Sequence, residues 1–96
     1  MRFRVELQLS VRWFLKRECS ADDRLAFDRM LEKLCDDPIG NSEPYRDPEL
    51  SRYMLRFFRF GDCLGVFGFL PAKDLILVVE CRRLSKKNRG RSDPSP

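Results

Sequence analysis

Residues 50–84 constrain the fold more than any other stretch, because three largely apolar segments are separated there by two turn signals. Gly61-Asp62 and Pro71-Ala-Lys-Asp74 are typical turn sequences. Consecutive β-strands are therefore predicted over residues 52–60, 63–70 and 75–81. The last of these, LILVVEC, is the most continuously apolar and β-branched. That composition predicts a central strand covered on both faces.

A fourth strand and two helices are predicted before this meander. Residues 2–9 alternate strictly between polar and apolar side chains, which indicates a half-buried strand. Ser10 is expected to cap a short helix over residues 11–19, in which Trp13 is a core or boundary aromatic. Ser20 is expected to cap a second helix that ends at Asp37-Pro38. This helix carries an apolar stripe that is expected to pack on the sheet: Leu25, Phe27, Met30, Leu31, Leu34 and Cys35.

The predicted order is β–α–α–β–β–β, an α+β fold in which a helical hairpin covers one face of a sheet. Residues 39–49 contain Gly40, Pro44 and Pro48 and are predicted to form a surface loop. Tyr45 in this loop is expected either to pin the loop to the body or to touch a partner. A length of 96 residues suits one domain, here residues 1–84. Residues 85–96 have no apolar side chain and are expected to be a disordered tail.

Positive charge is concentrated at the end of the chain. Residues 82–91 hold six cations and no acid, whereas the sequence up to residue 81 has 13 basic and 14 acidic residues. This distribution predicts either a local contact with a polyanion or a solvated tail. No apolar run approaches the ~20 residues that span a bilayer, and the N-terminus lacks a signal peptide's apolar core. A cytoplasmic protein without membrane contact is therefore expected.

Histidine is absent, which excludes Ser–His and Cys–His nucleophilic pairs and imidazole bases. The four cysteines are widely spaced without a C-x-x-C pair, so neither a zinc site nor a disulfide framework is predicted. A simple hairpin at residues 71–74 would place Cys63 and Cys81 nearly opposite each other on adjacent strands. Packing as small apolar thiols and a redox pair are both open for them.

Several landmarks together resemble the RelE/ParE superfamily of bacterial toxin–antitoxin toxins. They are the Asp37-Pro38 helix end, Arg59-Phe60-Gly61-Asp62, the strand Leu64-Gly-Val-Phe67 and the ending Val78-Val-Glu-Cys-Arg82-Arg83. The resemblance covers residue 2 to about residue 88. It implies a toxin with a cognate antitoxin as its partner. In the ribosome-dependent members, basic residues of this meander and a C-terminal Tyr or His cleave mRNA in the ribosomal decoding site.

For this chain the resemblance implies Arg56 and Arg82 as catalytic residues of a metal-independent endoribonuclease without a cofactor. The basic end of the last strand adds Lys86 as a third catalytic candidate. Three further cations are expected to bind phosphate: Arg59, Arg83 and Lys87. Two positions depart from the family pattern. Leu64 stands where an arginine is usual, and Asn88 stands near the C-terminal aromatic acid/base. Arginine stays protonated, so the four arginines can clamp a phosphate but cannot accept its proton.

Two alternatives remain open on the sequence. A ParE-like inhibitor of DNA gyrase would not need the ribonuclease residues, which suits Leu64 and Asn88. A catalytically degenerate module that still binds an antitoxin or nucleic acid would suit them equally. Growth arrest and the state of the mRNA after expression distinguish the three readings.

Overall fold

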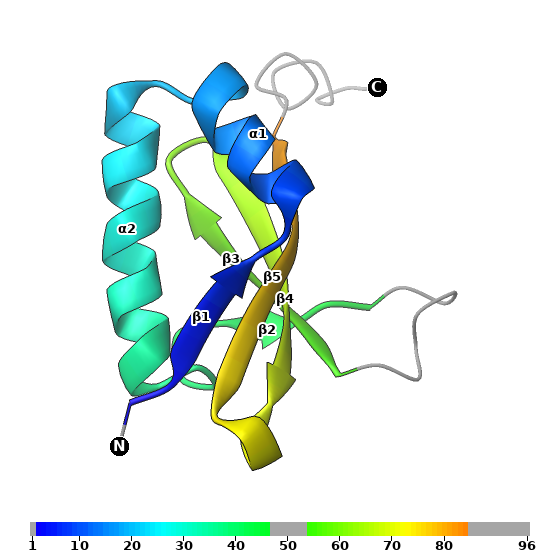
Figure 1. Cartoon of the computed structure of the whole chain (residues 1–96). Coiled ribbons are helices and arrows are strands. Elements are labelled where there is room, and N and C mark those ends of the chain that lie inside the picture. Colours follow the sequence, from blue (N-terminus) through cyan, green and yellow to red (C-terminus); the bar gives the residue numbers. More distant parts are fainter. Residues whose placement is uncertain (1, 47–53, 85–96) are drawn as a thin grey trace, which may run out of the picture.

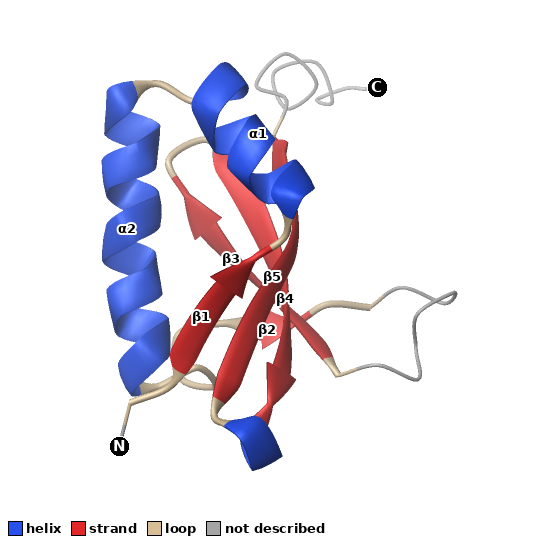
Figure 2. Ribbon diagram, viewed as in Figure 1, coloured by secondary structure: helices blue, strands red, loops and turns tan. Residues whose placement is uncertain are grey.

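A five-stranded mixed sheet carries two helices on one of its faces (Figures 1 and 2). The computed structural model describes residues 2–46 and 54–84. The strands lie in the order β1-β5-β4-β3-β2. The elements are β1 (Arg4–Leu7), α1 (Leu9–Glu18), α2 (Ala21–Asp36), β2 (Glu43–Pro44), β3 (Leu55–Phe60), β4 (Cys63–Leu70) and β5 (Leu75–Arg83).

The predicted α+β architecture is confirmed: the N-terminal strand joins the C-terminal meander in one sheet. β1 pairs with β5 in parallel, from Arg4 opposite Leu75 to Leu7 opposite Val78. The other neighbouring strands are antiparallel. The predicted loop 39–49 contains an unpredicted strand, β2, which pairs with Phe57 and Arg56 of β3. Its two residues are too few for any periodicity to show in the sequence.

One helix start is as predicted and the other is not. Ser20 caps α2 in a capping box, accepting the Asp23 N–H at 3.1 Å while its own N–H donates to the Asp23 carboxylate. The prediction that Ser10 caps α1 is wrong. The helix begins at Leu9, two residues earlier than predicted, because the Gln8 carbonyl already accepts the N–H groups of Val11 and Arg12. Ser10 is therefore an exposed residue of the first turn.

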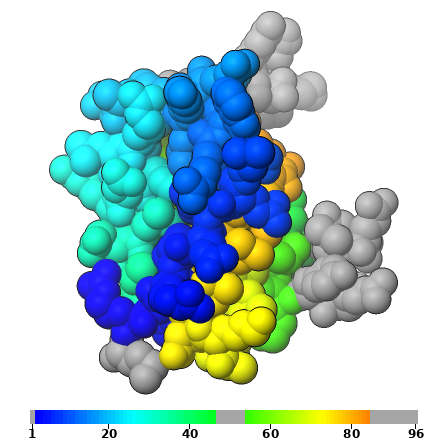
Figure 3. All heavy atoms as spheres, in the orientation of Figure 1, coloured from blue at the N-terminus to red at the C-terminus, as the bar shows by residue number. Residues whose placement is uncertain are grey.

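The core lies between the helices and the sheet. Val11, Phe27 and Leu34 from the helices are fully or almost fully buried. The apolar strand side chains of the same core cluster are buried to a similar extent. The Phe27 ring packs 4.9 Å from Phe60 and 5.9 Å from Phe58. Each buried ring of this kind contributes about 2–3 kcal/mol. In Figure 3, α1, α2, β1 and the turn after β4 cover this side of the molecule.

Three burial predictions need correction. Leu25 is 49% exposed. It lies two residues before the buried Phe27, and residues two apart in an α-helix point to nearly opposite sides. Trp13 is 46% exposed and lies against the Arg17 guanidinium, 4.5 Å from its ring centre. The strand covered on both faces is β4, whose first five residues are all buried. β5 lies between β1 and β4 but leaves Leu77 and Val79 partly exposed.

Neither α1 nor α2, the α-helices of the described chain, has the length and apolar character needed to cross a bilayer.

Candidate functional site

The sheet face opposite the helices, here called the outer face, carries the candidate site. Arg59 of β3, Leu64 of β4 and Arg82 of β5 lie opposite one another in a single cross-strand row. Residues directly opposite share a face, so the two arginines lie either side of Leu64. Their Cα atoms are two strand spacings apart, about 10 Å. The next row runs from Glu43 through Phe57 and Val66 to Glu80.

A β-bulge in β5 decides which arginine reaches this face. Phe67 pairs with Val78 and Val66 pairs with Glu80, so Val79 is left without an opposite residue. In an unbulged hairpin Arg82 would lie opposite Cys63, on the face covered by the helices. The extra residue reverses the alternation beyond it. It thereby sends Arg82 to the outer face and Arg83 to the inner one.

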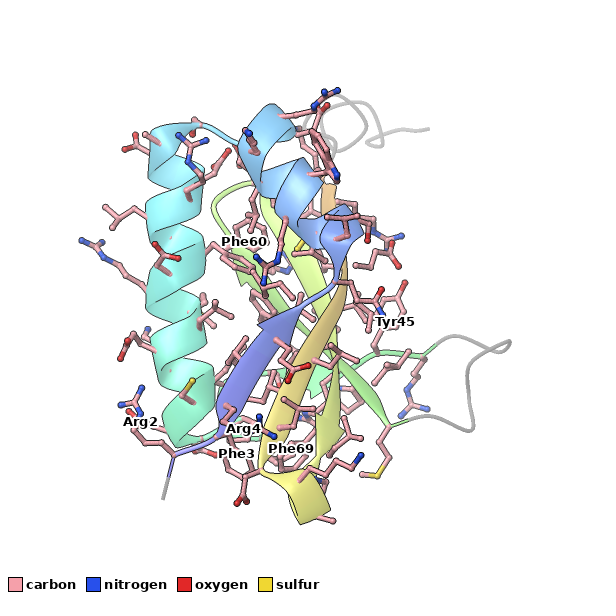
Figure 4. All side chains as sticks on the ribbon, viewed as in Figure 1. Arg2, Phe3, Arg4, Tyr45, Phe60 and Phe69 are labelled. Atoms are coloured by element: carbon pink, nitrogen blue, oxygen red, sulfur yellow. The ribbon has the colours of Figure 1, made fainter. Side chains whose placement is uncertain are left out.

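Tyr45 lies against Arg82. Its hydroxyl oxygen accepts a hydrogen bond from Arg82 Nη2 at 3.4 Å, and the guanidinium lies 6.0 Å from the ring centre. The ring also packs edge-on against Phe57, with centroids 6.3 Å apart. The backbone N–H of Tyr45 donates to the Leu55 carbonyl, which extends the β2–β3 pairing by one residue. Figure 4 shows Tyr45 beside the sheet on the side away from α2.

Acidic groups balance the arginines within the described part of this face. Glu80 Oε2 lies 3.7 Å from Arg82 Nη1, and both side chains are about half exposed. Glu43 shares the row of Phe57, whereas exposed Arg59 makes no hydrogen bond or ion pair with another described residue. In these two rows, two cations thus lie beside two carboxylates. Net positive charge comes from the sequence that follows, where residues 86–91 hold four cations and no acid.

Arg56 does not join Arg59 and Arg82, because it lies on the inner face and holds the loop before β2. Its Nε donates to Ser42 Oγ at 2.6 Å, and its Nη2 donates to the backbone carbonyls of Ser42 at 2.9 Å and Ile39 at 3.3 Å. These bonds bring one guanidinium onto a single turn of chain. They give Arg56 a structural role in holding this loop on β3.

Arg83 also points away from the outer face. Its Nη2 donates to the Glu18 carbonyl at the end of α1 and lies 3.7 Å from the Asp23 carboxylate of α2. It therefore ties the end of β5 to the junction of the two helices. Lys86 and Lys87, with Asn88, lie outside the described residues.

Sequence reasoning missed Tyr45 and Glu80 as neighbours of Arg82. Tyr45 was expected to pin its loop or to touch a partner, and nothing in its local sequence points to β5. The position of Glu80 beside Arg82 could not be predicted, because the face on which Glu80 lies depends on the bulge. Strand alternation by itself separates Arg56 from Arg59, since residues three apart along a strand lie on opposite faces.

The cysteines are arranged differently from the sequence expectation. Cys63 lies opposite Arg83 and Cys81 lies opposite Gly65, so these cysteines are diagonal neighbours. The sulfur atoms of Cys63 and Cys19 and a carboxylate oxygen of Asp23 lie within 4.8 Å of one another. All four cysteines are free thiols.

Three of these thiols, Cys19, Cys63 and Cys81, have a raised pKa and stay protonated at neutral pH. Burial, assisted by the neighbouring Cys19, raises the pKa of Cys63 to about 11. Burial also raises the pKa of Cys81 to about 12, and the pKa of Cys19 is raised for the same reason. The three ligand atoms could approach a metal ion, but Asp23 already accepts the Ser20 N–H and lies near Arg83. The arrangement is that of a thiol-lined part of the core.

An apolar groove of about 400 Å³ occupies the other end of the outer face. It is lined by side chains of β3, β4 and β5 that include Leu55, Leu70 and Leu77. The outer face therefore has a charged end, near the C-terminal end of β5, and an apolar end, near the turn between β4 and β5.

Comparison of the chain with protein-family models and with curated proteins found no match, so the RelE/ParE resemblance stays a prediction from the residues.

Proposed function

We propose that this chain is the toxin of a bacterial toxin–antitoxin pair and inhibits translation in the cytoplasm by cleaving mRNA on the ribosome. The observation that carries the proposal is the row Arg59–Leu64–Arg82 on the outer face, with Tyr45 bonded to Arg82. The RelE/ParE resemblance of the sequence supports the same function.

The row suits a phosphodiester. A guanidinium stays charged at any physiological pH and offers paired N–H donors to phosphate oxygens. Two such groups about 10 Å apart at their Cα atoms can hold one phosphate or two neighbouring ones. Donors fixed around the phosphorus also stabilise the charge that builds up when a ribose 2′-oxygen attacks it.

The charge balance supports a site that orients RNA rather than one that attracts it. The two rows around Arg82 add no net charge, and the attraction would come from residues 86–91, which include Lys86 and Lys87. A polycationic segment raises both the affinity for RNA and its dependence on salt. In this proposal, Arg59 and Arg82 bind the phosphate of the phosphodiester bond that is cleaved. Arg56 and Arg83 support the surrounding structure.

The apolar groove supports an antitoxin as the second partner. Grooves with side-by-side apolar side chains on an exposed sheet face are typical of protein-binding surfaces. A segment of the antitoxin that filled the groove beside Leu55 and Leu77 could continue over Arg82 and block RNA. The assignment of an antitoxin segment to this groove depends on the proposed function and would be withdrawn if that function were disproved.

A ParE-like inhibitor of DNA gyrase is the second candidate. The observation in its favour is Leu64, which is only 6% exposed and leaves the middle of the arginine row without a charge. An arrest of growth that leaves mRNA intact, with cleaved DNA accumulating in a gyrase supercoiling assay, would favour it.

The first test is expression in a bacterium without the antitoxin, followed by growth and mapping of RNA ends. Arg82→Ala should relieve growth arrest and abolish the ribosome-dependent cuts. Arg4→Ala is a matched control, because Arg4 is also an exposed strand arginine within 4 Å of a glutamate two residues away. It should leave the arrest unchanged. A folded protein that causes no arrest would leave a degenerate binding module.

A further inference from the structure

Two groups able to transfer protons lie at the two terminal nitrogens of one guanidinium. Glu80 Oε2 is 3.7 Å from Arg82 Nη1, and Tyr45 Oη is 3.4 Å from Arg82 Nη2. The three residues come from β5 and from the segment after β2, which are separated in the sheet by β3 and β4. Arg82 therefore fixes a carboxylate and a phenol on either side of itself.

The hydrogen bond between Arg82 and Tyr45 has a direction that matters. The guanidinium has no acceptor, so it donates and the phenol oxygen accepts. The phenol's own proton is not used in that bond and is available to a third group. The positive guanidinium would also stabilise negative charge that develops on the oxygen as this proton leaves. The ring is held in place by Phe57 and by the backbone bond to Leu55.

We propose that Glu80 and Tyr45 are the general base and the general acid of the cleavage reaction, an inference that rests on the proposed RNA-cleaving function. Glu80 removes the proton of the ribose 2′-hydroxyl as the 2′-oxygen forms a bond to phosphorus. The bond from phosphorus to the 5′-oxygen breaks, and Tyr45 gives its proton to that oxygen. The products are a 2′,3′-cyclic phosphate and a 5′-hydroxyl, and water returns the proton from Glu80 to Tyr45.

Other described groups on this face fit these roles less well. Arg59 and Arg82 stay protonated and serve as phosphate clamps. Glu43 shares the face but makes no hydrogen bond or ion pair with either arginine among the described residues. β4 contributes Leu64 and Val66 here, and neither of them titrates. On the far side of β5, β1 contributes Arg4 and Glu6, which pair with each other and lie beside Leu75 and Leu77.

The structure offers a control for Glu80. Glu6 is likewise an exposed strand glutamate, 3.8 Å from an arginine two residues away, but it lies on β1. Glu80→Gln, Tyr45→Phe, Glu43→Gln and Glu6→Gln should each keep the size of the side chain they alter. Circular dichroism and co-sedimentation with ribosomes would establish that each variant is folded and binds.

Cleavage of a defined mRNA on purified ribosomes, measured at single turnover over a range of pH, is the test. Glu80→Gln and Tyr45→Phe should each lose about 10²–10⁴-fold in rate while binding ribosomes as well as the parent chain. The parent rate should rise and then fall with pH. Residual cleavage by Glu80→Gln should lose the acidic limb of that profile, and residual cleavage by Tyr45→Phe should lose the alkaline limb.

The outcomes separate this inference from the function beneath it. Failure of the parent chain to cleave mRNA would overturn both. Parent cleavage with Glu80→Gln and Tyr45→Phe at full rate would overturn the assignment and leave the proposed function standing. Equal losses in Glu6→Gln, or a loss in Glu43→Gln without one in Glu80→Gln, would also overturn it.

Discussion

Replacing Arg56 by alanine should destabilise the protein rather than remove a catalytic group. The change deletes the guanidinium bonds to Ser42 Oγ and to the carbonyls of Ser42 and Ile39, which hold the loop onto β3. A hydrogen bond to a charged group contributes about 1.5–3 kcal/mol when it is well protected. The site is only partly buried, so the set should contribute about 2 kcal/mol in total. For a domain of this size that loss lowers the melting temperature by roughly 10 °C.

Thermal unfolding followed by circular dichroism, with Arg59→Ala alongside, would measure the difference. Arg59 makes no hydrogen bond or ion pair with another described residue. The free energy of unfolding of Arg59→Ala should therefore lie within ~0.5 kcal/mol of the parent's. In a cleavage assay run well below both transitions, Arg56→Ala should retain most activity and Arg59→Ala should lose most of it. An Arg56→Ala variant with the parent's melting temperature and no cleavage would refute this division of roles.

Two further predictions concern stability. Gly65→Ala should cost about 1–3 kcal/mol, because its Cβ would lie 2.5 Å from Cζ of the buried Phe58 ring. Gly68→Ala on the same strand meets its nearest atom at 3.8 Å and should be nearly neutral in urea denaturation; equal losses would contradict the geometry. Stability should also fall between pH 9 and 11. The folded protein keeps the Cys63 proton to a pKa of about 11, whereas the unfolded chain loses it near the ordinary value of 9.0. The loss should reach about 2–3 kcal/mol, and identical urea midpoints at pH 8 and pH 10.5 would contradict it.

The sequence was sufficient for the architecture because its strongest signals are local. The turn pairs at residues 61–62 and 71–74 mark the meander, and Ser20 with Asp23 marks the start of α2. Strand alternation is a local signal of the same kind, and it puts Arg56 and Arg59 on opposite faces. The tail predicted over residues 85–96 lies outside the described residues.

The candidate site was less predictable because it depends on pairing between distant segments. The bulge at Val79 decides that Arg82 lies on the outer face and that Cys63 lies opposite Arg83. No residue type marks a bulge of this kind in advance. Tyr45 reaches Arg82 only because β2 adds to β3, and a two-residue strand leaves no pattern to read.

The parallel pairing of β1 with β5 has a consequence for synthesis. Arg4 lies opposite Leu75, so the first strand has no partner while roughly 70 further residues are made, which takes about 4 to 14 s at about 5–20 residues per second. Over that interval both edges of β1 are unpaired, because β5 is its neighbour in the finished sheet. Pairing over so long a stretch of chain slows folding. β5 both supplies the partner of β1 and carries Arg82. A chain that stops before β5 therefore lacks both the complete sheet and the arginine row.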